Sequence, residues 1–200
     1  MSADSTFLVN KEKPGFSSKL AQLDGLLGQV FEEQGRKVVL FSEWTGMLDL
    51  IEPLLKQRKL NFVRLDGSVP QNKRQPLVHE FQTNPDCQLF LTTNAGSTGL
   101  NLQAANTVIN VDLPWNPPVL EQRIARAHRM GQTQPVQVFV LVTEQERGVV
   151  LRFGVFSRVL QPGPHFKAPW PIERVTKLNA TQSQAYTETI PVLARDGNMV

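Results

Sequence analysis

The stretch Lys37-Val-Val-Leu-Phe-Ser42 decides the fold of this chain of 200 residues. Its four consecutive apolar residues are typical of a strand that is buried on both faces, and the helical pattern of residues 44–58 follows directly. The same alternation then repeats. Further strands are predicted at 61–65, 88–92, 107–111 and 136–142, and further helices from residue 17 onward, at 71–81 and at 118–127. Strands that alternate with helices predict an α/β fold, with a parallel sheet flanked by helices.

The sequence changes character after Glu144. Gly154 lies between two apolar runs and predicts a hairpin, and the five prolines between 162 and 192 exclude long helices there. Further strands are predicted at 174–178 and 185–193. The sequence therefore predicts three segments, which are a disordered lead-in at 1–15, an α/β unit at 16–143 and a small β-rich piece at 144–200. We expect the last to be the least stable part of the folded chain, because its sheet is incomplete.

Composition and charge narrow the class of protein. No stretch approaches the roughly 18 consecutive apolar residues of a membrane helix, so we expect no membrane span and a cytoplasmic chain. Cys87 is the only cysteine, which excludes an internal disulfide and a cluster of thiolate metal ligands. Residues 1–144 carry 14 basic and 14 acidic side chains, so the whole net charge of +3 comes from 145–200. Net charge thus gives no case for nucleic acid, and such a case must rest on local clusters.

The segment 118–129 predicts a helix with two distinct faces. One face is apolar, with Leu120, Ile124 and Ala127. Gln122, Arg126 and Arg129 repeat the same spacing on another face, which holds two guanidinium groups side by side. Such a pair can stabilise the charge of phosphoryl transfer, an effect of about three to five orders of magnitude in rate, and the alternative is a solvated basic face. Arg123 lies about 100° around the helix from Gln122, so we expect it to meet solvent or a DNA phosphate.

A second cluster is the strand-to-loop segment Leu91-Thr-Thr-Asn-Ala-Gly-Ser-Thr-Gly-Leu-Asn-Leu102. Gly96 and Gly99 permit backbone amides to approach a phosphate closely, and the small hydroxyl residues add hydrogen-bond donors. The alternative is a tight turn with no ligand.

Together these segments resemble the carboxy-terminal helicase lobe of the SNF2-family remodelling ATPases. The matching segments stand in the family's order and spacing. They are Val38–Trp44, Arg64–Ser68, Thr93–Leu102, Val111–Pro117 and Gln122–Gln132. The resemblance implies that residues 16–143 form a RecA-like lobe, with duplex DNA as a partner.

The resemblance also implies roles for individual residues. Arg126 and Arg129 match the two arginines of the family's last motif and would be arginine fingers. Gln122 and Gly99 would lie on the nucleotide side. The residues expected on the DNA side, including Arg123 from its place on the helix, are Ser42, Gly67, Thr93, Asn94, Asn101 and Arg123.

The chain departs from a complete ATPase of this family in one respect. It contains no G-x-x-x-x-G-K-[ST] loop and no acidic D-E-x-H box, which would hold the phosphates and Mg²⁺. ATP and Mg²⁺ are therefore expected only together with an N-terminal RecA-like lobe as partner. The isolated chain is expected to be inactive, and no residue of its own is assigned as a metal ligand.

The last part of the chain resembles a different family. Segments 143–154, 160–167 and 189–200 are similar to the start of the stomatin/prohibitin (SPFH) domain of the HflK type. Val142-Thr-Glu144 fits both families and marks the join. The alternative functions are therefore an SPFH scaffold or protease-modulator fragment with SPFH oligomer partners, or a chimera without a function of its own.

Overall fold

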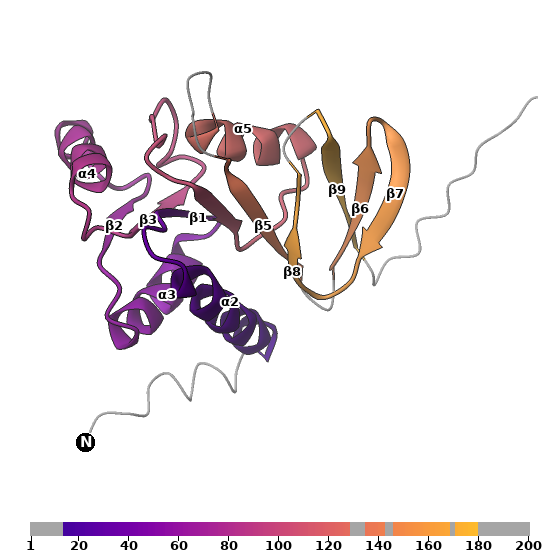
Figure 1. The fold of residues 1–200 in the computed structure, drawn as a ribbon, viewed down its shortest axis with the longest axis horizontal. Helices are drawn as coiled ribbons and strands as arrows, with labels where there is room; N and C mark the ends of the chain where they lie inside the picture. Colours follow the sequence, from indigo (N-terminus) through magenta and orange to yellow (C-terminus); the bar gives the residue numbers. More distant parts are fainter. Residues whose placement is uncertain (1–13, 129–134, 143–145, 169–170, 180–200) are drawn as a thin grey trace, which may run out of the picture.

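The computed structural model describes residues 14–128, 135–142, 146–168 and 171–179. A six-stranded sheet, in the order β2-β3-β1-β4-β5-β8, forms the centre of the molecule (Figure 1). Its strands are β1 (Val38–Ser42), β2 (Phe62–Leu65), β3 (Leu89–Thr93), β4 (Thr107–Asn110), β5 (Gln137–Val142) and β8 (Gly163–Phe166). The first five are mutually parallel, as the alternating pattern of strands and helices predicts.

Helices cover both faces of this sheet. They are α2 (Pro14–Glu32), α3 (Thr45–Gln57), α4 (Gln71–Thr83) and α5 (Pro117–Ala127). The first two pack on one face and the last two on the other, which gives two apolar layers (Figure 1). The predicted helices are thus confirmed, although α2 begins three residues before the expected Ser17. None of the described helices is long and apolar enough to cross a membrane.

Strand β1 lies in the middle of the sheet, and all five of its residues are buried. It pairs with β3 on one side and with β4 on the other, in register from Val38 onward. Because the three strands are parallel and in register, their carboxyl ends reach the same edge of the sheet. The loops that follow Ser42, Thr93 and Asn110 therefore leave the sheet close together.

The carboxy-terminal part of the described chain forms a second sheet. Its strands, in the order β7-β6-β9, are β6 (Glu146–Arg152), β7 (Val155–Leu160) and β9 (Glu173–Asn179). The predicted hairpin around Gly154 is confirmed, since β6 and β7 pair in antiparallel fashion. Phe153 and Gly154 make the turn with positive φ values of 51° and 83°.

The second sheet does not stand apart from the first. β8, which lies beyond the boundary predicted at residue 143, pairs antiparallel with β5 and becomes the sixth strand of the main sheet. Val150, Leu160 and Val175 are buried in the same apolar cluster as the α4 and α5 face of the main sheet. Lys167, only 1% exposed, forms an ion pair of 2.9 Å with Glu121 on α5. The tail is therefore packed against the lobe through apolar and charged contacts.

This shared packing predicts that a core mutation in the tail destabilises the helices of the lobe. Leu160→Ala should lower the free energy of unfolding by about 2–4 kcal/mol, because it removes a buried side chain from the common cluster. Unfolding followed by the helical circular dichroism signal measures the stability of the lobe, because every described helix lies before residue 128. Val159→Ala, at a site that is 42% exposed, is the matched control and should change stability by less than about 0.5 kcal/mol. An unchanged helical transition in Leu160→Ala would show that the lobe folds independently of the tail.

Glu173 at the start of β9 is the electrostatic centre of the tail. Its carboxylate accepts hydrogen bonds from Arg158 at 2.7 Å, from Arg152 at 3.0 Å and from the Ala168 amide at 3.0 Å. Burial alone would raise the pKa of Glu173, but these donors outweigh it and lower the pKa to about 2. A carboxyl group with a lowered pKa stabilises the folded state when it is ionised.

The stability of the chain should therefore fall in acid. The contribution of Glu173 is complete above its ordinary pKa of 4.5 and is lost as the pH falls toward 2. Glu173→Gln should remove about 2 kcal/mol at pH 7, a value reduced from the full shift because Arg152 and Arg158 are more than one-third exposed. Urea unfolding at pH 7 and at pH 3 measures this. The difference in the free energy of unfolding between wild type and variant should be smaller at pH 3 than at pH 7. A gap of equal size at both pH values would contradict the assignment.

Candidate functional site

The candidate site lies at the carboxyl edge of the main sheet, where α5 passes over the ends of β1, β3 and β4. Pro117 begins α5 and suits a first helical turn, because its missing amide would have no partner there. The predicted apolar face of α5 is confirmed, with Leu120, Ile124 and Ala127 all buried. This face fixes the rotation of the helix about its axis, and so determines which polar side chains face the strand ends.

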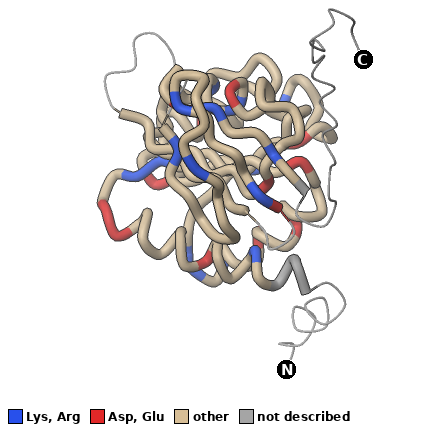
Figure 2. Tube along the Cα trace, turned by 90° about the vertical axis from the view of Figure 1, so that its right-hand side faces the viewer, with Lys and Arg blue, Asp and Glu red and all other residues tan. Residues whose placement is uncertain are grey.

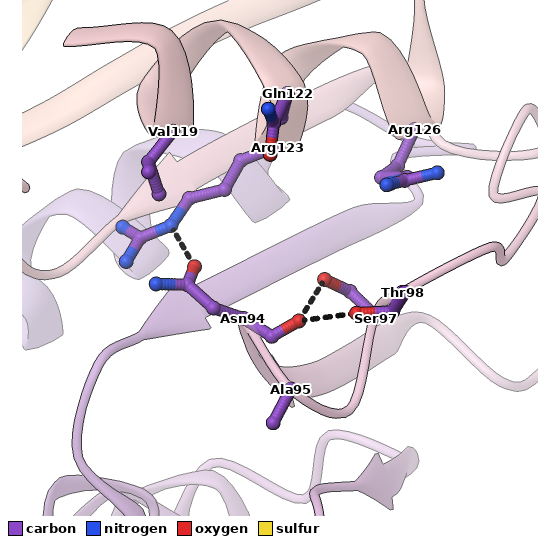
Figure 3. Close-up of a pocket in the computed structure, with 8 residues that line it drawn as sticks. All are labelled: Asn94, Ala95, Ser97, Thr98, Val119, Gln122, Arg123 and Arg126. Carbon is purple, nitrogen blue, oxygen red and sulfur yellow. Dashed lines mark hydrogen bonds between the residues drawn. The ribbon is translucent and has the colours of Figure 1, made fainter. Parts of the chain in front are cut away.

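Gln122 and Arg126 come together as their spacing predicts. Both line a hollow of about 300 Å³ between α5 and the loop after β3 (Figure 3). The full lining comprises Asn94, Ala95, Ser97, Thr98, Val119, Gln122, Arg123 and Arg126. Hydroxyl, amide and guanidinium groups thus converge on one space, and these are donors that suit a phosphate.

The second predicted finger cannot be placed in the same way. Helix α5 ends at Ala127, where the His128 amide donates to the Ile124 carbonyl. Arg129 falls outside the described residues, so its place beside Arg126 stays a prediction.

The expectation for Arg123 is wrong. Its side chain is buried, with only 2% of the residue exposed, so it does not extend into solvent. Arg123 does lie about 100° around the helix from Gln122, but this rotation brings it to the apolar face of α5. Position 123 is three residues after Leu120 and four before Ala127, so it shares their side of the helix. That spacing could have identified the buried position.

Arg123 instead joins α5 to the ends of several strands. Its Nε donates to Asn94 Oδ1 at 2.6 Å, and its Nη1 donates to the Asp112 carbonyl at 3.1 Å (Figure 3 shows the bond to Asn94). Nη1 also reaches Asn110 Oδ1 at 3.4 Å. Nη2 lies 3.7 Å from Glu43 Oε1 and makes no hydrogen bond although it is buried. Burial lowers the pKa of Arg123, against the charges of Asp112 and Glu43, but a guanidinium remains charged in proteins.

Asp112 organises the edge beside Arg123. Its carboxylate accepts hydrogen bonds from Ser42 Oγ at 2.6 Å, from the Glu43 amide at 2.7 Å and from Lys19 Nζ on α2 at 3.0 Å. Burial would raise the pKa of Asp112, but Lys19 and these hydrogen bonds outweigh it and the pKa lies below its ordinary value. Ser42 is fully buried, and its hydroxyl is already bonded within the protein. The Ser42 side chain is therefore closed to a ligand, and its place on the DNA side stays a prediction.

The loop after β3 is held largely by its own side chains. The Thr93 hydroxyl is buried and accepts a hydrogen bond from the Gly96 amide at 3.2 Å. The Asn94 carbonyl accepts from the hydroxyls of Ser97 and Thr98, each at 3.2 Å. At the far end, the Leu102 amide donates to the Arg126 carbonyl at 2.9 Å. The loop is thus attached to α5 at both of its ends.

Gly96 and Gly99 in this loop are required to be glycine for different physical reasons. A Cβ on Gly96 would lie 2.3 Å from the Leu65 carbonyl oxygen, so this position needs glycine for close packing against the end of β2. At Gly96, the backbone therefore approaches strand β2 closely, and not a phosphate as expected. Gly99 is exposed, has a φ of +75° and has open space around it, so it needs glycine for its backbone conformation. Asn101 is also exposed, and its side chain bonds to Gln103.

A second hollow, of about 510 Å³, lies on the other side of the same loop. It is lined by Glu43, Thr45, Asp49, Arg64, Asp66, Gly67, Ser68, Thr93, Asn94 and Ala95. Three residues predicted on the DNA side, Gly67, Thr93 and Asn94, meet here. Arg64 in this hollow is paired with Asp49, Glu52 and Asp66. A phosphate would consequently rely on hydroxyl and backbone amide donors here, rather than on that arginine.

Charged residues of both signs occur throughout the part of the chain that the structure describes. In the view of Figure 2, Lys and Arg residues are interspersed with Asp and Glu residues along the chain. No group of three His, Cys, Asp or Glu among the residues described in the structure is placed to hold a metal ion. The hollow between α5 and the loop after β3 fits the phosphates of a nucleotide, because the guanidinium of Arg126 lines it together with the amide of Gln122 and the hydroxyl of Thr98.

Comparison with known proteins gives two family matches along the chain. Residues 18–131 match the helicase conserved C-terminal domain. Residues 140–200 match the SPFH domain / Band 7 family. The two matches fall on the two parts that the sequence resembles, and the predicted join at Val142–Glu144 lies just inside the start of the second match.

The curated relatives are chromatin-remodelling ATPases. The chain is 45% identical over 128 residues to the chromatin-remodelling ATPase INO80 of Sclerotinia sclerotiorum, and 46% identical over 127 residues to INO80 of Saccharomyces cerevisiae. These matches cover 64% and 63% of this chain but only 7% and 8% of the relatives. The chain therefore spans less than a tenth of the length of either relative.

A solved structure supports the same assignment. The C-terminal part of the Fun30 ATPase domain is 38% identical, with a TM-score of 0.59, over 62% of this chain and 40% of that chain. Three comparisons thus point to the same family: this solved structure, the INO80 relatives and the domain match, which covers more than half of the sequence. The parallel sheet and the order of the motifs are consistent with that family. The chain therefore belongs to the helicase conserved C-terminal domain family, within the SNF2-type ATPases.

Proposed function

We propose that this chain acts as the second lobe of an ATP-dependent DNA translocase, where it completes an ATP site on a first lobe and contacts duplex DNA. The observation that carries the proposal is the hollow that Gln122 and Arg126 share with the loop after β3. It combines a nucleotide-side arginine and glutamine with the loop that the family places next to DNA. A solvated basic helix face would require neither the hollow nor the bonds between loop and helix.

Arg126, with Arg129 beyond the end of α5, would stabilise the negative charge that spreads over the γ-phosphate oxygens during transfer. Gln122, which lines the same hollow, would position the nucleotide. ATP with Mg²⁺ would supply the phosphoryl group, held on its other side by the phosphate-binding loop of the first lobe. The chain's own contribution is therefore a fixed guanidinium presented from a neighbouring lobe.

The DNA side of the proposal rests on the second hollow. Gly67, Thr93 and Asn94 line it, and exposed Asn101 lies on the same loop. Backbone amides and hydroxyls can bind phosphate oxygens without reading the base sequence, so contact with DNA would be independent of sequence. The chromatin-remodelling relatives favour DNA within chromatin as the substrate of the complete protein.

The purified chain alone should show no ATP turnover above background. Arginine fingers without a phosphate-binding loop and Mg²⁺ ligands have no bound phosphate to act on. A phosphate-release assay with and without duplex DNA measures this. Hydrolysis by the chain alone that disappears in Arg126→Ala would contradict the proposal.

Adding a first lobe from a similar SNF2-family ATPase, together with duplex DNA, should restore ATPase activity. Arg126→Ala or Arg129→Ala should then reduce the rate by about two orders of magnitude or more, because each removes stabilisation of the transition state. Arg58→Ala is the matched control, since this arginine pairs with Asp24 at the end of α3, away from both hollows. Restored activity that is indifferent to Arg126 would refute the finger assignment.

The match of residues 140–200 to the SPFH / Band 7 family supports a second candidate, a scaffold that assembles through the tail. Several apolar side chains of the second sheet are exposed, among them Phe156 at 61% and Val159 at 42%. Analytical ultracentrifugation separates the two proposals. Large, discrete oligomers that dissociate in Phe156→Ser would favour the scaffold, and a monomer would favour the translocase lobe.

A further inference from the structure

Arg123 is the largest fully buried side chain in the described part of the chain. Burial of a guanidinium costs several kcal/mol even when it is paired, and an apolar residue would fill the same space without that cost. The arginine nevertheless stands on the apolar side of α5, next to Leu120 and Ile124. Its bonds, rather than its bulk, are the feature that needs an explanation.

The polar contacts of Arg123 reach three different strand ends. Nε donates a hydrogen bond to Asn94 after β3 and Nη1 donates one to the Asp112 carbonyl after β4. Nη2 forms an ion pair of 3.7 Å with Glu43 after β1, without a hydrogen bond. The guanidinium also lies over the ring of Phe41, 5.7 Å from its centre. A planar group with a fixed fork of donors holds its partners in one relative orientation, which a lysine cannot do.

Asn94 is the partner that connects this arginine to both candidate ligand sites. Asn94 and Ala95 line the hollow beside Gln122 and Arg126, and they also line the hollow beside Gly67 and Thr93. This short segment is therefore the wall between the two. A shift of Asn94 caused by a ligand in one hollow would be transmitted to α5 by the 2.6 Å bond to Arg123, one turn before Arg126.

We infer that Arg123 is a positioning residue that couples the DNA side of the lobe to its nucleotide side, by fixing Arg126 relative to the Asn94 loop. The inference rests on the proposed function. It assigns to Arg123 no contact with ATP or with DNA. Its effect is on how strongly DNA accelerates hydrolysis, since the same bond holds the loop and the helix.

The test uses the full chain with a first lobe of a similar ATPase, with and without duplex DNA. The quantity measured is the ratio of the ATPase rates with and without saturating DNA. A smaller folded fraction lowers both rates equally, so a merely structural defect leaves this ratio unchanged. The variants are Arg123→Lys, Arg123→Gln, Asn94→Ala and the double variant Asn94→Ala with Arg123→Gln, and Arg58→Gln is the control.

We expect both Arg123 variants to reduce the ratio about tenfold, within the usual range of coupling between sites. Asn94→Ala should reduce it similarly, and the double variant should be no worse than the worse single one, because both remove one shared bond. Arg58→Gln should keep the wild-type ratio.

Three results would overturn the inference. Arg123→Lys with a wild-type ratio would show that charge alone suffices. Losses that multiply in the double variant would show that Arg123 and Asn94 act separately. The third result is that the two wild-type lobes together show no ATPase activity, which would refute the proposed function and this inference with it. This result differs from the other two because the wild-type protein itself is inactive.

Discussion

The burial of one guanidinium at the carboxyl edge of a parallel sheet constrains the rest of this structure. Arg123 can be buried only where several oxygen acceptors converge, because an unpaired charge in the interior costs too much. The Asn94 side chain, the Asp112 carbonyl and the Glu43 carboxylate provide that convergence. They lie close together because β1, β3 and β4 run parallel and in register. The sheet topology thus places the acceptors, and the arginine then fixes α5 on them.

The tail adds a second constraint on the same helix. Lys167 pairs with Glu121 on α5, and Lys177 lies 4.8 Å from the centre of the Trp115 ring just before that helix. β8 extends the main sheet beyond β5, so the apolar cluster under α5 continues into the second sheet. Residues that match a different family are therefore packed against the helix that carries Arg126. The tail thus contacts, at Glu121, the same helix whose Gln122 and Arg126 line the candidate nucleotide site.

Much of the fold was predictable because its elements have strong, simple patterns. The apolar runs of β1 and β3 and the spacing of Leu120, Ile124 and Ala127 each specify one kind of element, and the structure confirms them. The convergence of Gln122 and Arg126 on one hollow also followed from helical spacing. The spacing of Arg123 from Leu120 and Ala127 indicates its buried position on α5. Its hydrogen-bond and ion-pair partners come from distant segments of the chain, so no local pattern contains them.

Two further features needed three-dimensional information for the same reason. Gly96 packs against the carbonyl of Leu65 at the end of β2, about thirty residues earlier in the chain, so the sequence around Gly96 does not reveal why this position needs glycine. The addition of β8 to the main sheet depends on an antiparallel pairing across a predicted domain boundary. A change of family resemblance along a sequence does not by itself mark a change of packing unit.

The central claim is that the surface of α5 completes a phosphate site on another lobe, and nucleotide binding tests it most directly. The measurement is isothermal titration of ADP with aluminium fluoride, a mimic of the transferring phosphoryl group, into a first lobe with duplex DNA, in the presence or absence of this chain. The account predicts that the chain tightens binding by about tenfold or more, and that Arg126→Ala abolishes the gain. Equal affinity with and without the chain would contradict the account.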